Sequence, residues 1–147
     1  MSFASVLSRA QYGMEAPLVR VEAHIGAGLP LFAVVGLPEA VVRESRERVR
    51  AALTTVGFEF PAGRITVNLS PADFPKEGGR FDLPIALGVL AASGQVEERA
   101  LAGTEFFGEL SLGGELRAMR GALPAAVPPR RGSSQRRASP PPGTCTT

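Results

Sequence analysis

"RITVNLSPADFPKEGGRFDLPIALGVLAAS", residues 64–93, contains a strand pattern, a loop and a helix pattern in direct succession. Residues 64–70 alternate apolar and polar side chains, as a strand with one buried face does. Residues 82–93 are apolar almost all round and rich in small side chains, which predicts a buried and closely packed helix. Asp82 stands where an N-cap is expected, and Pro84 falls in the first turn, where its missing N–H costs no hydrogen bond. We therefore expect this helix to be the centre of the core.

Strand patterns also precede this unit. Residues 18–25, LVRVEAHI, alternate in polarity, and residues 1–10 predict a further strand. Residues 31–37, LFAVVGL, are continuously apolar, which is typical of a strand covered on both faces. The GAGLP segment at 26–30 favours a hairpin connection between the two neighbouring strands.

Between these strands and residue 64, residues 38–56 repeat apolar side chains at helical spacing. Pro38 suits the first helical turn, and Gly57 suits the position after the last turn. Acids and bases alternate on the other face, which predicts a solvated helix surface. Glu39 with Arg43 and Glu44 with Arg48 form two oppositely charged pairs at a spacing of four residues, with the acid first. Each such pair stabilises a helix by about 0.2–0.5 kcal/mol.

The carboxyl-terminal part adds short strands. Residues 104–119 read as two strands joined by the turn pair Gly113-Gly114. A chain of 147 residues suits one domain with one core. The sequence thus predicts an α+β domain with a mixed sheet of about five to six strands and two main helices, at about 38–56 and 82–93.

Positive charge is concentrated at the end of the chain. Residues 1–127 contain 12 Lys and Arg against 14 Asp and Glu, a net charge of −2, whereas residues 128–147 contain four Arg and no acid. That last segment also has five Pro and no Val, Ile, Leu, Met or Phe, which predicts a disordered basic tail. The basic isoelectric point is therefore a property of the tail and not of the folded body.

Several classes of protein and site are not expected. Cys145 is the only cysteine and His24 the only histidine, so neither an intrachain disulfide nor a His/Cys metal cluster is predicted. The amino terminus lacks a signal-peptide pattern, and no apolar run reaches 18 residues. We expect a cytoplasmic protein that does not interact with membranes.

The loop at residues 74–80, FPKEGGR, raises the question of a phosphate site. A nucleotide-binding P-loop needs G-x-x-x-x-G-K-[ST], but the only lysine, Lys76, precedes the glycines, so no ATP site and no cofactor are predicted for this chain. Gly78, Gly79 and Arg80 still precede a helix amino terminus, where an anion could bind. The alternative is a simple strand-to-helix turn.

In that alternative, Arg80 is exposed and pairs with Glu77 or Asp82. These two acids form a small cluster with Asp73, and paired carboxylates can perform acid–base chemistry. Such residues more often cap helices and form turns, and we favour that interpretation here.

Two long blocks carry a resemblance: residues 28–53, GLPLFAVVGLPEAVVRESRERVRAAL, and residues 60–95, FPAGRITVNLSPADFPKEGGRFDLPIALGVLAASGQ. Residues 3–127 strongly resemble the amino-terminal domain of the ComM/YifB family of magnesium-chelatase-like AAA+ ATPases. The resemblance implies a ribosomal-protein-type fold like the proteolytic domain of Lon. It also implies an AAA+ motor that binds ATP and Mg, hexamers, and action on DNA through branch migration in natural transformation.

Lon-type peptidases carry a serine in a P-K-D-G-P-S-A-G loop and a lysine in a later G-G-L-K segment. Matching the motifs places Arg80 at the serine and Leu123 at the lysine, so neither nucleophile nor base is present. The resemblance thus implies a domain that is not an enzyme.

Two functions stay open for such a domain: direct DNA contact, or oligomerisation and partner docking without it. The residues proposed to contact DNA or another anion, if they share one face, are Lys76, Gly78, Gly79, Arg80, Arg43, Arg46 and Arg50.

The resemblance ends near Pro128-Pro129. A family member would continue through a helix and a strand into the motor, whereas residues 128–147 are a Pro/Arg/Ser segment. One hypothesis is a truncated or frameshifted product whose domain 1–127 lacks its last helix and strand. The rival hypothesis is a short protein with a basic tail.

Overall fold

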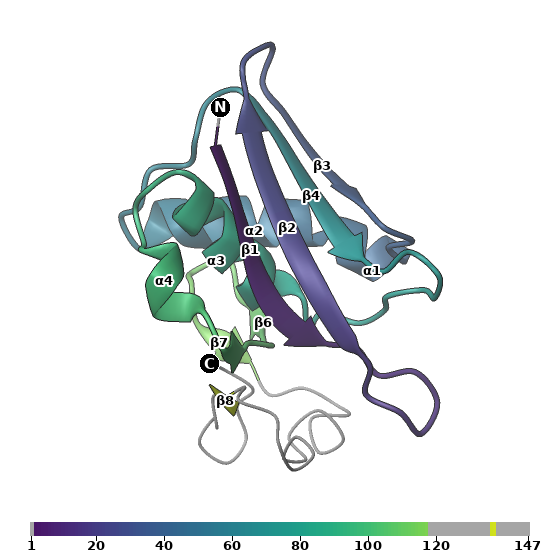
Figure 1. Ribbon diagram of the computed structural model, residues 1–147. Helices are drawn as coiled ribbons and strands as arrows, with labels where there is room; N and C mark the ends of the chain where they lie inside the picture. Colours follow the sequence, from purple (N-terminus) through teal and green to yellow (C-terminus); the bar gives the residue numbers. More distant parts are fainter. Residues whose placement is uncertain (1, 118–135, 138–147) are drawn as a thin grey trace.

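The computed structural model describes residues 2–117 and 136–137. One mixed sheet forms the first layer of the domain, and helices pack on one of its faces to form the second (Figure 1). This arrangement confirms the predicted α+β class. The sheet contains β1 (Ser2–Arg9), β2 (Leu18–Gly26), β3 (Leu31–Val35), β4 (Arg64–Ser70), β5 (Thr104–Glu105) and β8 (Arg136–Arg137).

The strand order in this sheet is β3-β4-β2-β1-β5-β8. β2 pairs antiparallel with both β1 and β4, whereas β3 runs parallel to β4 and β5 parallel to β1. The helices are α1 (Ala40–Arg43), α2 (Ser45–Thr55), α3 (Asp82–Ala92) and α4 (Glu98–Leu101). Because β3 and β4 are adjacent and parallel, α1 and α2 form the crossover between them.

α3 is the central element of the core, as the apolar pattern of residues 82–93 predicts. It packs on β1 and β2 and is buried on nearly every side. Gly88 allows this close approach, because a Cβ placed there would lie 3.3 Å from the Cβ of Ala23 on β2. Small side chains in α3 therefore set how closely the helix layer approaches the sheet.

Two predictions about residues 26–37 are wrong. β2 and β3 do not form a hairpin, because β4 inserts between them. β3 is also not covered on both faces: it is an edge strand, with Phe32 and Val34 buried towards the helices but Leu31 and Val35 exposed. A continuous apolar run is therefore not evidence of a central strand in this domain.

The helix predicted over residues 38–56 is divided at Glu44 into α1 and α2. Pro38 lies outside the first turn, because it forms a parallel bridge with Lys76 and leaves Glu39 as the N-cap. Gly57 has a φ of +100° and follows the last turn, as predicted.

The prediction of two strands over residues 104–119 is partly wrong. β5 joins the main sheet, and a separate hairpin forms from β6 (Glu109–Leu110) and β7 (Leu116–Arg117). Gly114, with a φ of +92°, lies in the turn of this hairpin. Of the predicted tail, only β8 belongs to the described residues, so the predictions about the rest of residues 128–147 and about Leu123 lie outside them.

Candidate functional site

The loop between β4 and α3 buries the only lysine of the chain. Lys76 is 0% exposed, and its Nζ donates hydrogen bonds to the carbonyl oxygens of Pro71 and Phe74, the latter at 2.9 Å. The same Nζ lies 4.4 Å from the centroid of the Phe74 ring. In this conformation the ammonium group holds the loop together and does not face a ligand in solvent.

Burial lowers the pKa of Lys76, because desolvation disfavours the charged amine; the charge of Asp73 acts in the opposite direction. A lowered pKa increases the fraction of the amine that is unprotonated and able to react, but a reagent must first reach it. We therefore expect burial to decide the reactivity of this side chain.

In a native chain treated with an amine-acylating reagent, Lys76 should react on the order of a hundredfold more slowly than in the denatured chain, because reaction requires local opening of the loop. Lys76 is the only lysine, so mass spectrometry needs to separate only this site from the α-amine, which is the internal control. Equal rates at Lys76 in native and denatured chain would show that the amine is accessible.

Asp82 is the centre of a buried polar network at the start of α3. Its carboxylate is fully buried and accepts a hydrogen bond from Ser45 Oγ at 2.5 Å. Arg48 donates to the two carboxylate oxygens at 2.6 and 3.1 Å, and the backbone N–H of Leu110 donates at 3.0 Å. The hydrogen bond with Asp82 raises the pKa of Arg48. One carboxylate thus connects α2, α3 and β6.

The contacts at the start of α3 correct three predictions. Phe81, not Asp82, occupies the N-cap position of α3, and Asp82 is the first helical residue. The charged face of α2 is not only solvated, because Arg48 turns inward from it while also lying 3.6 Å from Glu44. Arg80 is not exposed: it is 4% exposed, and its Nη2 donates to Gln11 Oε1 at 3.0 Å.

The amino end of α3, where the sequence suggests that an anion could bind, has carboxylates beside it. A Cβ placed on Gly79 would lie 2.8 Å from the Cδ of Glu109, so this glycine allows the Glu109 side chain to pack against the loop. Asp82 already binds Arg48, and the charge of Glu109 also acts on Arg48, so this arginine is engaged by carboxylates and not by a phosphate. Gly78, by contrast, faces open space.

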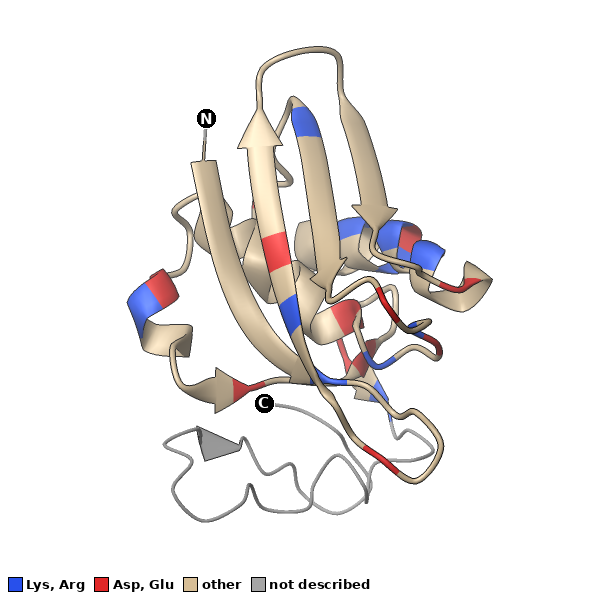
Figure 2. Cartoon of the chain, turned by 45° about the vertical axis from the view of Figure 1, so that its right-hand side comes forward, with Lys and Arg blue, Asp and Glu red and all other residues tan. Residues whose placement is uncertain are grey.

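The three predicted arginines of α1 and α2 do not share an exposed surface with Lys76 and Arg80, because these last two side chains are buried. Arg43 is exposed on α1, and its Nη1 donates to Pro38 O at 3.0 Å. Arg46 on α2 donates to Phe32 O at 3.3 Å, and the guanidinium of Arg50 lies 4.5 Å from the Phe60 ring centroid. Acidic residues alternate with these arginines along the helices (Figure 2). The predicted contact residues therefore do not form one continuous exposed basic surface.

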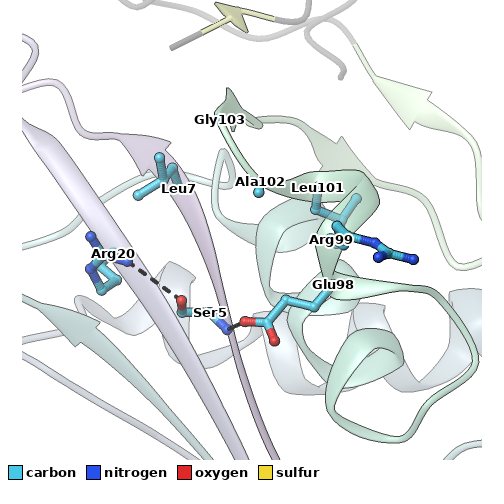
Figure 3. A pocket seen from close by; sticks show the side chains of 8 residues that line it. All are labelled: Ser5, Leu7, Arg20, Glu98, Arg99, Leu101, Ala102 and Gly103. Atoms are coloured by element: carbon cyan, nitrogen blue, oxygen red, sulfur yellow. Dashed lines mark hydrogen bonds between the residues drawn. The ribbon is translucent and has the colours of Figure 1, made fainter. Parts of the chain in front are cut away.

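A depression of about 320 Å³ lies elsewhere, between β1 and α4 (Figure 3). Glu98 of α4 accepts a hydrogen bond from the backbone N–H of Ser5 at 2.8 Å, and Arg20 reaches Ser5 Oγ at 3.5 Å. None of the predicted site residues lines it.

Among residues 2–117 and 136–137, no three His, Cys, Asp or Glu side chains come together to hold a metal ion.

Sequence reasoning missed a second buried acid. Glu105 of β5 is 1% exposed and forms two hydrogen bonds with Arg9 of β1, at 2.8 and 3.0 Å. The two residues are 96 positions apart, so no local pattern indicates the pair.

In the part of the chain that the structure describes, no helix is long and apolar enough to cross a membrane.

Comparison with known proteins now decides the family. Residues 21–138 match the family described as subunit ChlI of Mg-chelatase. The chain is 56% identical over 127 residues to the competence protein ComM of Haemophilus influenzae, covering 86% of this chain and 25% of the relative. The chain belongs to the ComM/YifB family. This confirms the resemblance seen in residues 28–53 and 60–95.

Two other members of the ComM/YifB family show how far the similarity extends. The uncharacterised protein YifB of Escherichia coli is 52% identical over 127 residues, covering 86% of this chain and 25% of the relative. A protein of Mycobacterium tuberculosis is 43% identical over 131 residues, covering 89% of this chain and 26% of its own length. The chain thus spans about a quarter of the length of these relatives, and it corresponds to the amino-terminal domain of an AAA+ family.

Proposed function

We propose that this chain is a non-catalytic domain of a DNA-acting AAA+ ATPase of the ComM type, and that it serves in assembly or docking. The observation that carries the proposal is the buried network at the start of α3. Arg80, at the position that the Lon resemblance gives to the nucleophile, is buried against Gln11. Asp82 beside it is fully engaged by Ser45, Arg48 and Leu110.

In this proposal the polar residues at the former catalytic position stabilise the domain. A serine nucleophile needs an oxygen and an adjacent base that substrate can reach, whereas Ser45 Oγ is buried and donates to Asp82. ATP and Mg would be bound by a motor domain outside this chain. Branch migration during natural transformation would then be an activity of the whole protein, to which this domain contributes contacts.

Direct DNA contact is the second candidate, and the arginines of α1 and α2 favour it. Arg43 and Arg50 are exposed and lie seven residues apart, with Arg46 between them in the sequence. Guanidinium groups at such spacing can contact successive phosphates. Against this, Glu39, Glu44 and Glu47 alternate with them, and all three acids are also exposed.

A salt titration of DNA binding separates the two candidates. The four arginines at 130, 131, 136 and 137 are first changed to Gln in the full chain, so that the basic segment does not dominate. Three arginines of α1 and α2 are then changed: Arg43→Gln, Arg46→Gln and Arg50→Gln. The matched control removes the same charge from exposed arginines elsewhere: Arg64→Gln, Arg99→Gln and Arg117→Gln.

For an assembly domain, we expect the two triple variants to lower DNA affinity equally and weakly, since only net charge changes. If the arginines contact DNA directly, the helix triple should reduce the steepness of log affinity against log salt by about 2.7, because each of three lost phosphate contacts contributes about 0.9. The control triple should leave this slope unchanged. That second result would contradict the assembly proposal.

A further inference from the structure

Within the described residues, β3 is an edge strand whose outer side pairs with no other strand. In the six-stranded sheet of the described residues no strand follows β3, whereas the opposite side of β1 is covered in part by β5 (Figure 2). Glu98 further protects the β1 edge by accepting the N–H of Ser5 at 2.8 Å. The β3 edge is therefore the better candidate for adding a further strand.

The sequence of β3 and its flanking residues carries no charge that would prevent pairing with another strand. Residues 26–38 contain no charged side chain, although natural edge strands commonly carry charges that prevent pairing. Five large apolar side chains in and around β3 are 43% to 87% exposed. They are Leu29, Leu31, Val35, Leu37 and Val41.

The backbone of β3 presents hydrogen-bonding groups to the outside. The N–H of Leu31 donates to Gly63 O at 3.2 Å, so Leu31, Ala33 and Val35 direct their backbone groups towards β4. Phe32 and Val34 consequently direct theirs outward. The outward direction is visible at Phe32, whose carbonyl oxygen accepts the hydrogen bond from Arg46.

The residue that follows this edge is strained and exposed. Leu37 has a φ of +59°, a left-handed conformation that residues other than glycine rarely adopt, and its side chain is 52% exposed. Backbone strain of this kind is found at ligand-binding and contact sites, so its presence at an exposed apolar residue is consistent with a contact at this edge.

We propose that β3 pairs antiparallel with β3 of a second copy of this chain, across a two-fold axis at Ala33. In this register Phe32 and Val34 of the two copies exchange backbone hydrogen bonds. Leu31 of each copy then lies opposite Val35 of the other on the open face. The proposal rests on the assembly function proposed above and names its contact surface.

The occupant is a second copy because the β3 sequence is complementary to itself. Read in either direction from Ala33, L-F-A-V-V places apolar residues opposite apolar residues on both faces. A two-fold axis requires such a self-matching surface. Arg46 must release Phe32 O when the strands pair, so this arginine protects the edge of the single chain.

A cysteine at the axis tests the register. In the full chain with Cys145→Ser, Ala33→Cys should form a disulfide-linked dimer under mild oxidation, because the two Ala33 residues would be a directly opposed, non-hydrogen-bonded pair. Leu31→Cys is the matched control on the same face. Its two copies would be about 14 Å apart along the strands, too far for a disulfide.

Charge on the open face tests the contact without an engineered bond. Leu31→Lys with Val35→Lys places like charges opposite each other, and we expect the dimer dissociation constant to rise by about tenfold or more. Met14→Lys with Leu112→Lys adds the same charge at exposed positions outside the edge and should leave the constant unchanged. Sedimentation equilibrium measures both, and circular dichroism confirms that each variant is folded.

Equal cross-linking at both cysteine positions, or a monomeric wild-type chain at millimolar concentration, would overturn the β3 pairing. The assembly function could survive that result, because the DNA titration with the arginine variants tests it separately. A reduced salt slope for the helix triple would contradict an assembly role without DNA contact, and the cysteine and lysine variants would still decide the β3 pairing.

Discussion

Asp82→Asn should lower the free energy of unfolding by about 3 kcal/mol or more, because the largely buried Arg48 loses its buried anion and keeps only the exposed Glu44. The side chain of Arg48 is 18% exposed, and its hydrogen bonds to Asp82 are 2.6 and 3.1 Å long. The new amide group would also place hydrogen atoms near the N–H of Leu110, which donates to Asp82 Oδ2. Urea denaturation measures the loss.

Glu77→Gln is the matched control for this variant. Glu77 is an exposed carboxylate in the same loop, so its loss should change stability by no more than about 0.5 kcal/mol. A double-mutant cycle with Arg48→Gln should show a coupling energy of about 1 kcal/mol or more between positions 48 and 82. An Asp82→Asn chain as stable as the control would mean that the network does not hold α2, α3 and β6 together.

Gly36→Ala is the second variant with a large expected effect. Gly36 follows β3 with a φ of +104°, and a Cβ there would lie 2.2 Å from Leu69 O and 2.8 Å from Leu69 N on β4. Backbone cannot yield as a flexible side chain can. We expect a loss of at least about 3 kcal/mol in the free energy of unfolding, from overpacking together with backbone strain.

Gly28→Ala separates the strain from the clash. Gly28 also has a positive φ, of +127°, but a Cβ at this glycine meets nothing within 4 Å. It should cost only the conformational part, about 1–2 kcal/mol. If both alanine variants were equally destabilised in urea, the close approach of residue 36 to β4 would not be the reason that glycine is needed.

The sequence was sufficient for the elements whose evidence is local. The alternation of residues 64–70 and the uniform apolarity of 82–93 predicted β4 and α3 with nearly correct bounds. Gly57 marked the end of α2 because a positive φ after a helix is a local requirement. The α+β class followed from these elements.

What could not be predicted depends on contacts between distant residues. Asp82 resembles an N-cap in its local sequence, but its partners lie 34 to 37 residues before it and 28 residues after it. The edge position of β3 depends on β4 inserting next to β2, which hydrophobic periodicity cannot show. The sequence makes Lys76 a candidate anion contact, because composition does not reveal that the loop carbonyls already bind its amine.

Amide hydrogen exchange in the full chain, measured at dilute and at millimolar concentration, is the decisive measurement for an assembly role of the β3 edge. We expect protection of the Phe32 and Val34 amides to increase with concentration, because both N–H groups point outward in the single chain. The Leu31 amide, which already donates to Gly63 O, should not change. Phe32 and Val34 amides that exchange at the same rate at both concentrations would contradict pairing through β3.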